Sequence, residues 1–133
     1  NDSLRAILHH VETFWDHRHA PNVELFHYSD LLRDLDGQMR RLARVLGVEA
    51  DEDVWPELVT ATEFEAMKGN ADSLNPGLTT NHWIDPKGFF SKGGTGRWRG
   101  VIDEADMPRY KGRVRELVPT DLAAWVHHGW LGT

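Results

Sequence analysis

Residues 89–99 read FFSKGGTGRWR, a stretch that mixes glycines with basic and aromatic side chains. Glycine tolerates positive φ angles and close approach, so successive backbone N–H groups can converge on an anion. Lys92 adds positive charge, and Phe89 or Trp98 offers a face on which a base can stack. The stretch therefore predicts a site for the phosphate end of a nucleotide. A flexible basic loop that binds nothing is the alternative.

The spacing of these glycines excludes two common nucleotide motifs. Gly88 and Gly93 have the spacing of a Walker loop, but Gly94 stands where that motif requires lysine, and no strand is expected before it. A dinucleotide fingerprint requires a third glycine at the position of Arg99. A phosphate site in this stretch is therefore of another kind.

The charge distribution favours one local anion site over a nucleic-acid surface. The formal net charge is −6, whereas residues 86–100 carry four basic side chains and no acidic one, which leaves −10 on the rest of the chain. Nucleic-acid binders need a broad basic face to displace counterions from phosphates. We therefore expect a nucleotide cosubstrate and no nucleic acid. Arginine outnumbers lysine by eleven to four, which favours a GC-rich bacterial source.

Composition limits the remaining chemistry and the location. The chain of 133 residues contains no cysteine, which excludes disulfides, thiolate zinc sites and a thiol nucleophile. No apolar run has the length of a membrane span, and residues 1–10 lack the basic start and apolar core of a signal peptide. We expect a soluble cytoplasmic protein without membrane contact, formed as one domain or part of one.

Apolar periodicity predicts a mostly helical chain. An amphipathic helix is expected from Ser3 to about His19, on apolar residues at three- and four-residue steps: Leu4, Ile7, Leu8, Val11, Phe14 and Trp15. Further helices are expected after Asp36, with a left-handed stop at Gly47, and after residues 51–53 toward Met67. A last long helix is expected from Asp103 until Pro119, which precedes an apolar tail. Residues 23–28 (VELFHY) form the one predicted strand. A lone strand needs partners, from another chain or from an upstream part of the fold. Residues 69–88 lack periodicity and are predicted to be a lid or an acceptor loop.

Eight histidines suggest a metal site as a further hypothesis. His10 and His17 are seven residues apart on one face of the first predicted helix, with His9 and Asp16 nearby. No third ligand stands at a matching spacing, and surface histidines are the commoner explanation. A metal-binding helical protein remains the third function considered.

Four segments carry an ordered pattern. Residues 26–31 (FHYSDL) resemble an FxYEDL segment, residues 37–48 an I..IA.FLG helix, residues 62–68 (TEFEAMK) a TSFEAMK segment, and residues 90–98 (FSKGGTGRW) an FRKGxxGDW loop. In this order, the chain resembles the C-terminal half of the cytosolic-type sulfotransferases, which use 3′-phosphoadenosine 5′-phosphosulfate. The resemblance extends from the first helix to about Tyr110.

The resemblance implies an α/β fold and a set of nucleotide contacts. Residues 1–133 would be a single, mainly helical C-terminal segment of a P-loop-like sulfotransferase domain, with residues 23–28 as about one strand of its parallel sheet. The implied cofactor-binding residues are Tyr28, Thr62, Phe64, Met67, Phe89, Phe90, Ser91, Lys92 and Gly93. Lys92 and Gly93 would contact the 3′-phosphate, because an ammonium and backbone N–H groups suit a dianion. Tyr28, Thr62, Phe64 and Met67 would border the adenine in an apolar slot.

The chain departs from the family pattern at several positions. Ser91 replaces an arginine, which removes a bidentate phosphate contact, and Arg97 or Arg99 would have to supply the charge instead. Glu63 replaces a serine and is expected to face solvent, since it would repel an anion. The family's short dimerisation pattern is not recognisable after Trp98.

The resemblance also implies that essential parts lie upstream of Asn1. These are the loop that cradles the 5′-phosphosulfate and the strand with the histidine general base. No catalytic residue is expected in this chain, so residues 1–133 should not turn over alone. The intact protein would move a sulfuryl group to a hydroxyl or amine and release 3′,5′-adenosine diphosphate. The alternative is a truncated, non-catalytic helical interaction module.

Overall fold

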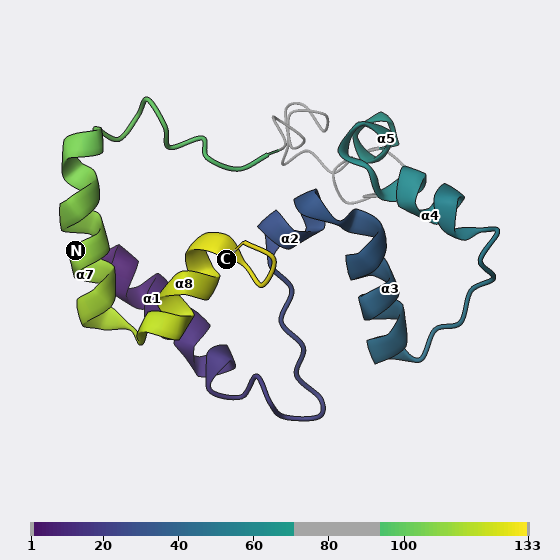
Figure 1. The fold of residues 1–133 in the computed structure, drawn as a ribbon, viewed down its shortest axis with the longest axis horizontal. Helices are drawn as coiled ribbons and strands as arrows, with labels where there is room; N and C mark the ends of the chain where they lie inside the picture. Colours follow the sequence, from purple (N-terminus) through teal and green to yellow (C-terminus); the bar gives the residue numbers. More distant parts are fainter. Residues whose placement is uncertain (1, 71–93, 133) are drawn as a thin grey trace, which may run out of the picture. The chain divides into compact units, whose positions relative to one another are not determined.

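The structure, a computed structural model, describes residues 2–70 and 94–132. Its elements in chain order are α1 (Asp2–Trp15), α2 (Tyr28–Arg33), α3 (Leu35–Leu46), α4 (Trp55–Thr62), α5 (Phe64–Gly69), the 3₁₀ turn η3 (Glu104–Asp106), α7 (Met107–Leu117) and α8 (Thr120–His128) (Figure 1). The chain divides into two compact units. The first joins Asn1–Asp34 to Gly96–Thr133, and the second is Leu35–Thr95.

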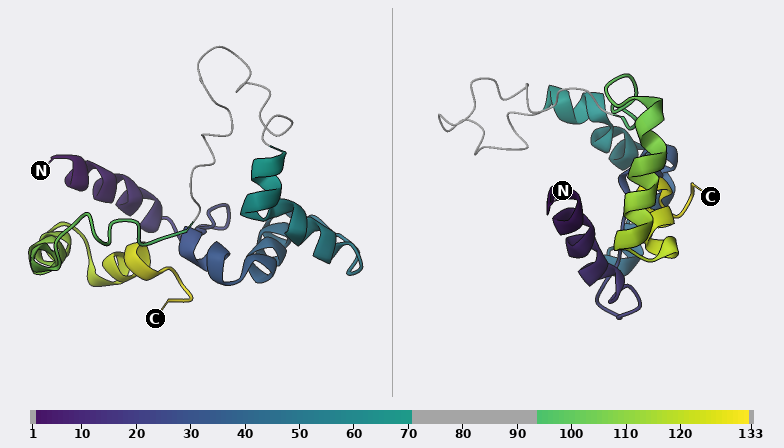
Figure 2. Two further views of the ribbon diagram at one scale, coloured as in Figure 1. Left: turned by 90° about the horizontal axis from the view of Figure 1, so that it is seen from above. Right: turned by 90° about the vertical axis from the view of Figure 1, so that its left-hand side faces the viewer.

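The first unit is built on α1, α7 and α8. Helix α7 contacts both α1 and α8, as the views in Figure 1 and Figure 2 show. Five buried apolar side chains form the core: Leu8, Trp15, Val114, Val118 and Leu122. Leu8 and Trp15 are two turns apart on α1, so they share one face. The predicted amphipathic stripe of this helix is therefore confirmed, although Ile7 and Phe14, which belong to the same pattern, are exposed.

Helix α1 ends at Trp15, before the predicted end at about His19. After Phe14 the backbone turns tighten, because the N–H of His17 donates to the carbonyl of Phe14 and that of Arg18 to the carbonyl of Trp15, both at 3.1 Å. The side chain of Arg18 reinforces this end. Its Nη1 donates a hydrogen bond of 2.8 Å to the carbonyl of Trp15, and its guanidinium lies 4.3 Å from the centre of a Trp15 ring. A helix end leaves carbonyl groups without partners, and a basic side chain can satisfy one of them.

The predicted strand at residues 23–28 is not formed here. Residues 23–27 have irregular backbone, and Tyr28 is already the first residue of α2. A strand requires a neighbouring backbone that pairs with it, and residues 2–70 and 94–132 contain no strand. The segment bonds instead to the C-terminal part of the unit, because His27 Nε2 lies 3.1 Å from the carbonyl oxygen of Val126.

The C-terminal region contains one more helix than predicted. The carboxylate of Asp103 accepts a 3.0 Å hydrogen bond from the backbone N–H of Ala105, and this cap begins η3 in place of the predicted long helix. Helix α7 follows at Met107 and ends at Leu117. Pro119 separates α7 from α8, which forms where only an apolar tail was expected.

Helix α3 of the second unit ends as the sequence predicts. Gly47 has a φ of 66°, the backbone N–H of Val48 donates to the carbonyl of Ala43 at 2.9 Å, and that of Gly47 donates to the carbonyl of Arg44 at 3.3 Å. These contacts make a Schellman cap, in which glycine adopts the left-handed conformation. The helix starts at Leu35, so that Asp36 lies in its first turn and not at the cap.

The helix predicted to run toward Met67 is divided into α4 and α5. Glu63 lies between them with extended backbone (φ −62°, ψ 147°). The hydroxyl of Thr62 lies 2.9 Å from the carbonyl of Val59 and 3.3 Å from that of Leu58. Such local side-chain bonds compete with the regular helix ladder and bend or end helices.

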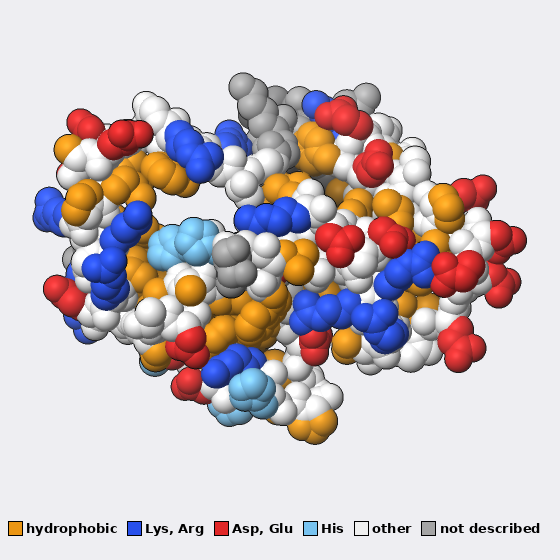
Figure 3. All heavy atoms as spheres, viewed as in Figure 1, with side chains coloured by type: hydrophobic (Ala, Val, Ile, Leu, Met, Phe, Trp, Pro, Cys, Tyr) orange, Lys and Arg blue, Asp and Glu red, His pale blue; other side chains and the backbone are white. Residues whose placement is uncertain are grey.

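Arg40 ties α3 to the loop before α4. It donates to Asp36 at 3.0 Å and to Glu52 at 2.6 Å, and its guanidinium lies 4.6 Å from the centre of the buried Trp55 ring. The hydrogen bond to Glu52, followed by that to Asp36, raises the pKa of Arg40 above its ordinary value. Figure 3 shows acidic side chains gathered over this loop, where residues 51–53 are exposed.

Little apolar surface is buried within the described part of the second unit. Trp55 and Gln38 are its buried side chains. Four apolar side chains of α3 and its exit are between 43% and 65% exposed: Leu42, Val45, Leu46 and Val48. Among residues 2–70 and 94–132, no helix is long and apolar enough to cross a membrane.

Candidate functional site

The described chain contains four of the nine predicted nucleotide contacts. Tyr28 belongs to the first unit, and Thr62, Phe64 and Met67 belong to the second. The other five predicted contacts lie outside the described residues: Phe89, Phe90, Ser91, Lys92 and Gly93. The predicted lid at residues 69–88 also lies outside them, apart from Gly69 at the end of α5 and Asn70.

Thr62, Phe64 and Met67 lie close in sequence, on either side of the bend between α4 and α5. Phe64 begins α5 and Met67 stands three residues later, so both side chains lie on one side of the helix. Both are half-buried, while Thr62 is exposed. The ammonium of Lys68 lies 6.0 Å from the centre of the Phe64 ring. Phe64 and Met67 therefore form a half-buried apolar surface beside the positive charge of Lys68. We call this pair the apolar corner.

Thr62 has several acceptors for one hydroxyl proton. Besides the two helix carbonyls, its Oγ1 lies 3.1 Å from the sulfur of Met39 on α3. A hydroxyl donates once and retains lone pairs that can accept. Thr62 can therefore accept a hydrogen bond from an amino group while its own proton stays within the protein. Glu63 is exposed, which confirms the expectation that it faces solvent.

Tyr28 begins α2, and half of its surface is exposed. The backbone before it is fixed by His27, whose Nδ1 lies 3.1 Å from the backbone N of Ser29 and acts as the helix cap. An exposed aromatic ring on a capped helix start is suited to contact a base.

The end of the glycine-rich stretch makes a tight turn. Gly94 and Gly96 have φ angles of 103° and 77°, which side chains disfavour. The backbone N–H of Arg99 donates to the carbonyl of Gly96 at 3.0 Å, and a Cβ on Gly96 would lie 2.4 Å from Nη1 of Arg99. The guanidinium of Arg99 also lies 5.3 Å from the centre of a Trp98 ring. Arg97 and Arg99 are both exposed, and Arg99 in addition packs on its own turn.

The histidines considered for a metal site have other contacts. His17 Nδ1 lies 2.8 Å from the carbonyl of Thr13, and the ring of His10 meets the ring of Phe14 edge-on at 5.2 Å. Over the described ranges 2–70 and 94–132, no group of three or more potential ligands could hold a metal ion.

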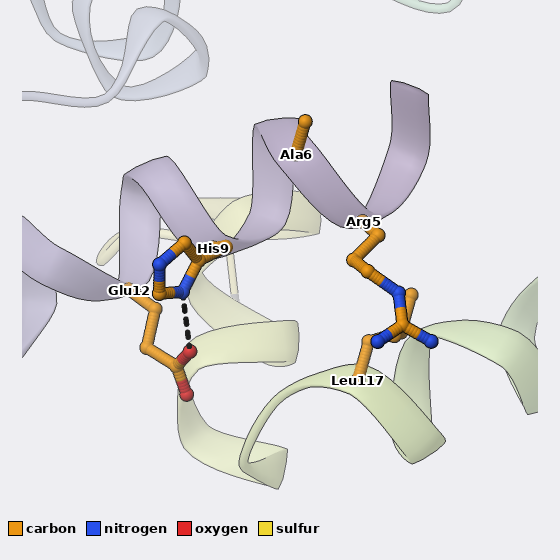
Figure 4. A pocket seen from close by; sticks show the side chains of 5 residues that line it. All are labelled: Arg5, Ala6, His9, Glu12 and Leu117. Atoms are coloured by element: carbon orange, nitrogen blue, oxygen red, sulfur yellow. Dashed lines mark ion pairs between the residues drawn. The ribbon is translucent and has the colours of Figure 1, made fainter. Parts of the chain in front are cut away.

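The described residues line two hollows away from Tyr28, Thr62, Phe64 and Met67. One, of about 350 Å³, lies between α1 and α7 and is lined by Arg5, Ala6, His9, Glu12 and Leu117 (Figure 4). His9 faces Glu12 across 3.6 Å there. The other, of about 590 Å³, is lined by residues of α3, the following loop and Trp55. None of the four predicted contacts within residues 2–70 and 94–132 lines either hollow.

Asp30 is a residue that sequence reasoning did not single out. It is fully buried, and its carboxylate accepts hydrogen bonds from the backbone N–H groups of Trp130 at 2.7 Å and Leu131 at 3.1 Å. Arg33 donates to it at 3.3 Å. Trp130 and Leu131 are about one hundred residues away in the chain, so local sequence carries no signal of their contact with Asp30.

Comparison with known proteins identifies the family. Residues 3–118 match the sulfotransferase domain. The chain belongs to the sulfotransferase family. The predicted resemblance is therefore confirmed for nearly the whole chain.

The relatives show how much of a sulfotransferase this chain covers. It is 42% identical over 130 residues to a glycolipid sulfotransferase of Mycobacterium bovis, which is 98% of this chain and 40% of that protein. It is 30% identical over 102 residues to the luciferin sulfotransferase of Photinus pyralis, which is 71% of this chain and 27% of that protein. The chain thus spans at most two fifths of either relative.

A solved structure supports the fold assignment. A crystal structure of retinol dehydratase in complex with androsterone and the inactive cofactor PAP matches with a TM-score of 0.66 and 28% identity. The match covers 85% of this sulfotransferase chain and 33% of that one. The fold is therefore that of a sulfotransferase, represented here by helices.

Proposed function

We propose that this chain is the nucleotide-binding C-terminal part of a sulfotransferase that transfers a sulfuryl group from 3′-phosphoadenosine 5′-phosphosulfate to a hydroxyl or amine. In this reaction the sulfur–oxygen bond to the 5′-phosphate breaks and a bond from sulfur to the acceptor forms. The acceptor's proton passes to a base, and 3′,5′-adenosine diphosphate leaves. The match of residues 3–118 to the sulfotransferase domain carries this proposal, and the PAP bound to the retinol dehydratase structure supports it.

Lys92 and Gly93 hold the 3′-phosphate in this proposal. A lysine ammonium and backbone N–H groups make charge-assisted hydrogen bonds to a phosphate. Ser91 stands where the family pattern has arginine, so another cation must compensate. We assign that role to Arg97, because Arg99, which is also exposed, already contacts Trp98 and the Gly96 turn.

Thr62, Phe64, Met67 and Tyr28 border the adenine. The half-buried apolar corner of Phe64 and Met67 suits a purine ring, and Thr62 retains acceptor capacity for an amino group. The exposed ring of Tyr28 supports its assignment to the same base. Phe89 and Phe90 complete the slot as apolar residues of the glycine-rich stretch.

The remaining parts of the active site belong to the upstream half of the domain. These parts are the loop for the 5′-phosphosulfate and the general base, so residues 1–133 bind without catalysing. Residues 23–28 would pair as a strand only with the sheet of that half. The exposed apolar side chains of α3 support further packing of this kind.

The acceptor contacts are assigned to residues 69–88. The name of the Mycobacterium bovis relative makes a glycolipid hydroxyl the first acceptor to assay. A cytoplasmic location remains part of the proposal.

Nucleotide binding tests this function directly. We would titrate the full-length protein that carries these residues with 3′,5′-adenosine diphosphate and follow tryptophan fluorescence. Lys92→Ala should weaken binding at least about tenfold, which corresponds to the loss of about 1.4 kcal/mol from one charge-assisted contact. Lys111→Ala is the matched control, because Lys111 is an exposed lysine of α7 outside the predicted site.

The two measurements test the proposed function and the assignment of the 3′-phosphate contact separately. Failure of the unaltered protein to bind the nucleotide contradicts the proposed function and favours a non-catalytic module. Unchanged affinity in Lys92→Ala contradicts the assignment of the 3′-phosphate contact.

A further inference from the structure

Residues on both sides of Tyr28 are bonded to the C-terminal end of the chain. His27 precedes Tyr28, and Asp30 follows two residues after it. Both contact residues 125–131, which comprise the end of α8 and its exit. We name this segment the C-terminal clasp. All of these residues belong to the first unit.

The hydrogen bonds of His27 define which of its two ring nitrogens carries a proton. Its Nδ1 accepts the backbone N–H of Ser29, so Nε2 carries the proton and donates to the carbonyl of Val126 at 3.1 Å. The edge of the ring also meets Trp125 at 5.3 Å with an interplanar angle of 75°. The residue before Tyr28 is thus held by two neighbouring positions of α8.

Asp30 joins α2 to the exit from α8. Its two carboxylate oxygens accept the backbone N–H groups of Trp130 and Leu131, and both oxygens are buried. Nη1 of Arg33 donates to Asp30 at 3.3 Å and also to the carbonyl of His128 at 2.8 Å. Replacing the carboxylate would leave two partly buried backbone N–H groups without this acceptor, which costs stability and local order.

Gly129 allows the clasp to approach Asp30 closely. Its backbone (φ 72°, ψ −166°) lies in a region that favours glycine, and a Cβ there would lie 2.3 Å from Oδ1 of Asp30. The next residue, Trp130, stacks on Trp15 of α1 at 5.4 Å with an interplanar angle of 18°. The clasp is therefore anchored to the core of the unit as well as to α2.

We propose that the C-terminal clasp positions Tyr28 against the nucleotide base, with Asp30 as the positioning residue. The inference rests on the proposed function, because it assigns Tyr28 to that site. The ring of Tyr28 is half exposed, so its direction depends on how the start of α2 is held. A pre-organised side chain loses less conformational entropy when a ligand binds. The clasp lies beyond residue 118, where the match to the sulfotransferase domain ends.

A double-mutant cycle tests this role in the full-length protein. Asp30→Asn keeps the shape of the side chain but places an NH₂ group against a backbone N–H. It should weaken binding of 3′,5′-adenosine diphosphate at least fivefold when Tyr28 is present. In the Tyr28→Ala background the same change should weaken binding less than twofold, because residues that act through each other are non-additive. Isothermal titration calorimetry measures all four affinities.

A second substitution covers the case in which Asp30→Asn does not fold. Arg33→Met removes the hydrogen bonds to Asp30 and His128 from a side chain that is 45% exposed. Arg33→Met is combined with Tyr28→Ala in the same double-mutant cycle. It should weaken nucleotide binding when Tyr28 is present and have little effect in the Tyr28→Ala background. Arg113→Met is the control, since Arg113 forms a similar ion pair with Glu116 on α7, three residues apart. Circular dichroism confirms folding of each protein.

Two results would overturn the inference. Equal losses of affinity with and without Tyr28 would show that Asp30 supports the fold but does not act through Tyr28. Unchanged affinity in Asp30→Asn and Arg33→Met would show that the clasp does not position the site. In either case Lys92→Ala still reports separately on the proposed function.

Discussion

Gly129→Ala should destabilise the first unit strongly. Residue 129 has φ 72° and ψ −166°, a conformation that costs a residue with a side chain about 1–3 kcal/mol. The added Cβ would also lie 2.3 Å from Oδ1 of Asp30 and 2.6 Å from its Cγ, so the carboxylate or the chain must move. That movement breaks at least one of the hydrogen bonds from Trp130 and Leu131. A hydrogen bond to a charged group contributes about 1.5–3 kcal/mol.

The free energy of unfolding should therefore fall by about 2.5–6 kcal/mol, from backbone strain and one lost hydrogen bond together. Urea unfolding of the full-length protein, followed by tryptophan fluorescence, measures this change, because Trp15, Trp125 and Trp130 cluster in the affected unit. Gly112→Ala is the matched control. Gly112 lies inside α7 with nothing within 4 Å of a new Cβ, so alanine should stabilise the protein by about 0.5–1 kcal/mol. A Gly129→Ala protein within about 0.5 kcal/mol of the original would refute the packing of the clasp on Asp30.

Two further substitutions test the packing of each unit. Leu122→Ala removes a side chain that is 0% exposed, and it should lower the free energy of unfolding by about 2–5 kcal/mol in urea; a loss below about 1 kcal/mol would contradict the core described. Gly47→Ala has open space but a φ of 66°, so it should cost about 1 kcal/mol, whereas Gly47→Asn should cost less because asparagine tolerates this conformation better. Equal thermal stability of the alanine and asparagine variants would argue against the Schellman cap.

Local sequence signals predicted most of the helices but not all of their ends. The apolar spacing of α1 and the glycine stop of α3 depend on neighbouring residues, and both predictions are confirmed. The end of α1 is made by two tight backbone turns, which the Arg18 side chain reinforces at Trp15. The division between α4 and α5 likewise depends on local bonds made by Thr62. Side-chain choices of this kind are not encoded in periodicity.

Long-range contacts explain why some predicted elements differ from the described structure and why some features were not predicted. The strand at residues 23–28 depends on a partner strand, and the described residues supply contacts with α8 in its place. The apolar residues after Pro119 form a helix because Leu122 packs on the core made by α1 and α7. Nothing in the sequence around Asp30 distinguishes it from an exposed aspartate at the start of a helix. Its carboxylate is buried where it accepts the backbone N–H groups of Trp130 and Leu131. The ordered motifs, by contrast, were sufficient to predict the family.

The preference for a 3′-phosphate tests the central claim most directly. The affinities of the full-length protein for 3′,5′-adenosine diphosphate and for 5′-adenosine monophosphate should differ at least about tenfold, in favour of the diphosphate. In Lys92→Ala this ratio should fall toward one, because the lost contact serves the 3′-phosphate alone. Equal affinities in the unaltered protein, or a Lys92→Ala protein that weakens both nucleotides by the same factor, would contradict the proposed site.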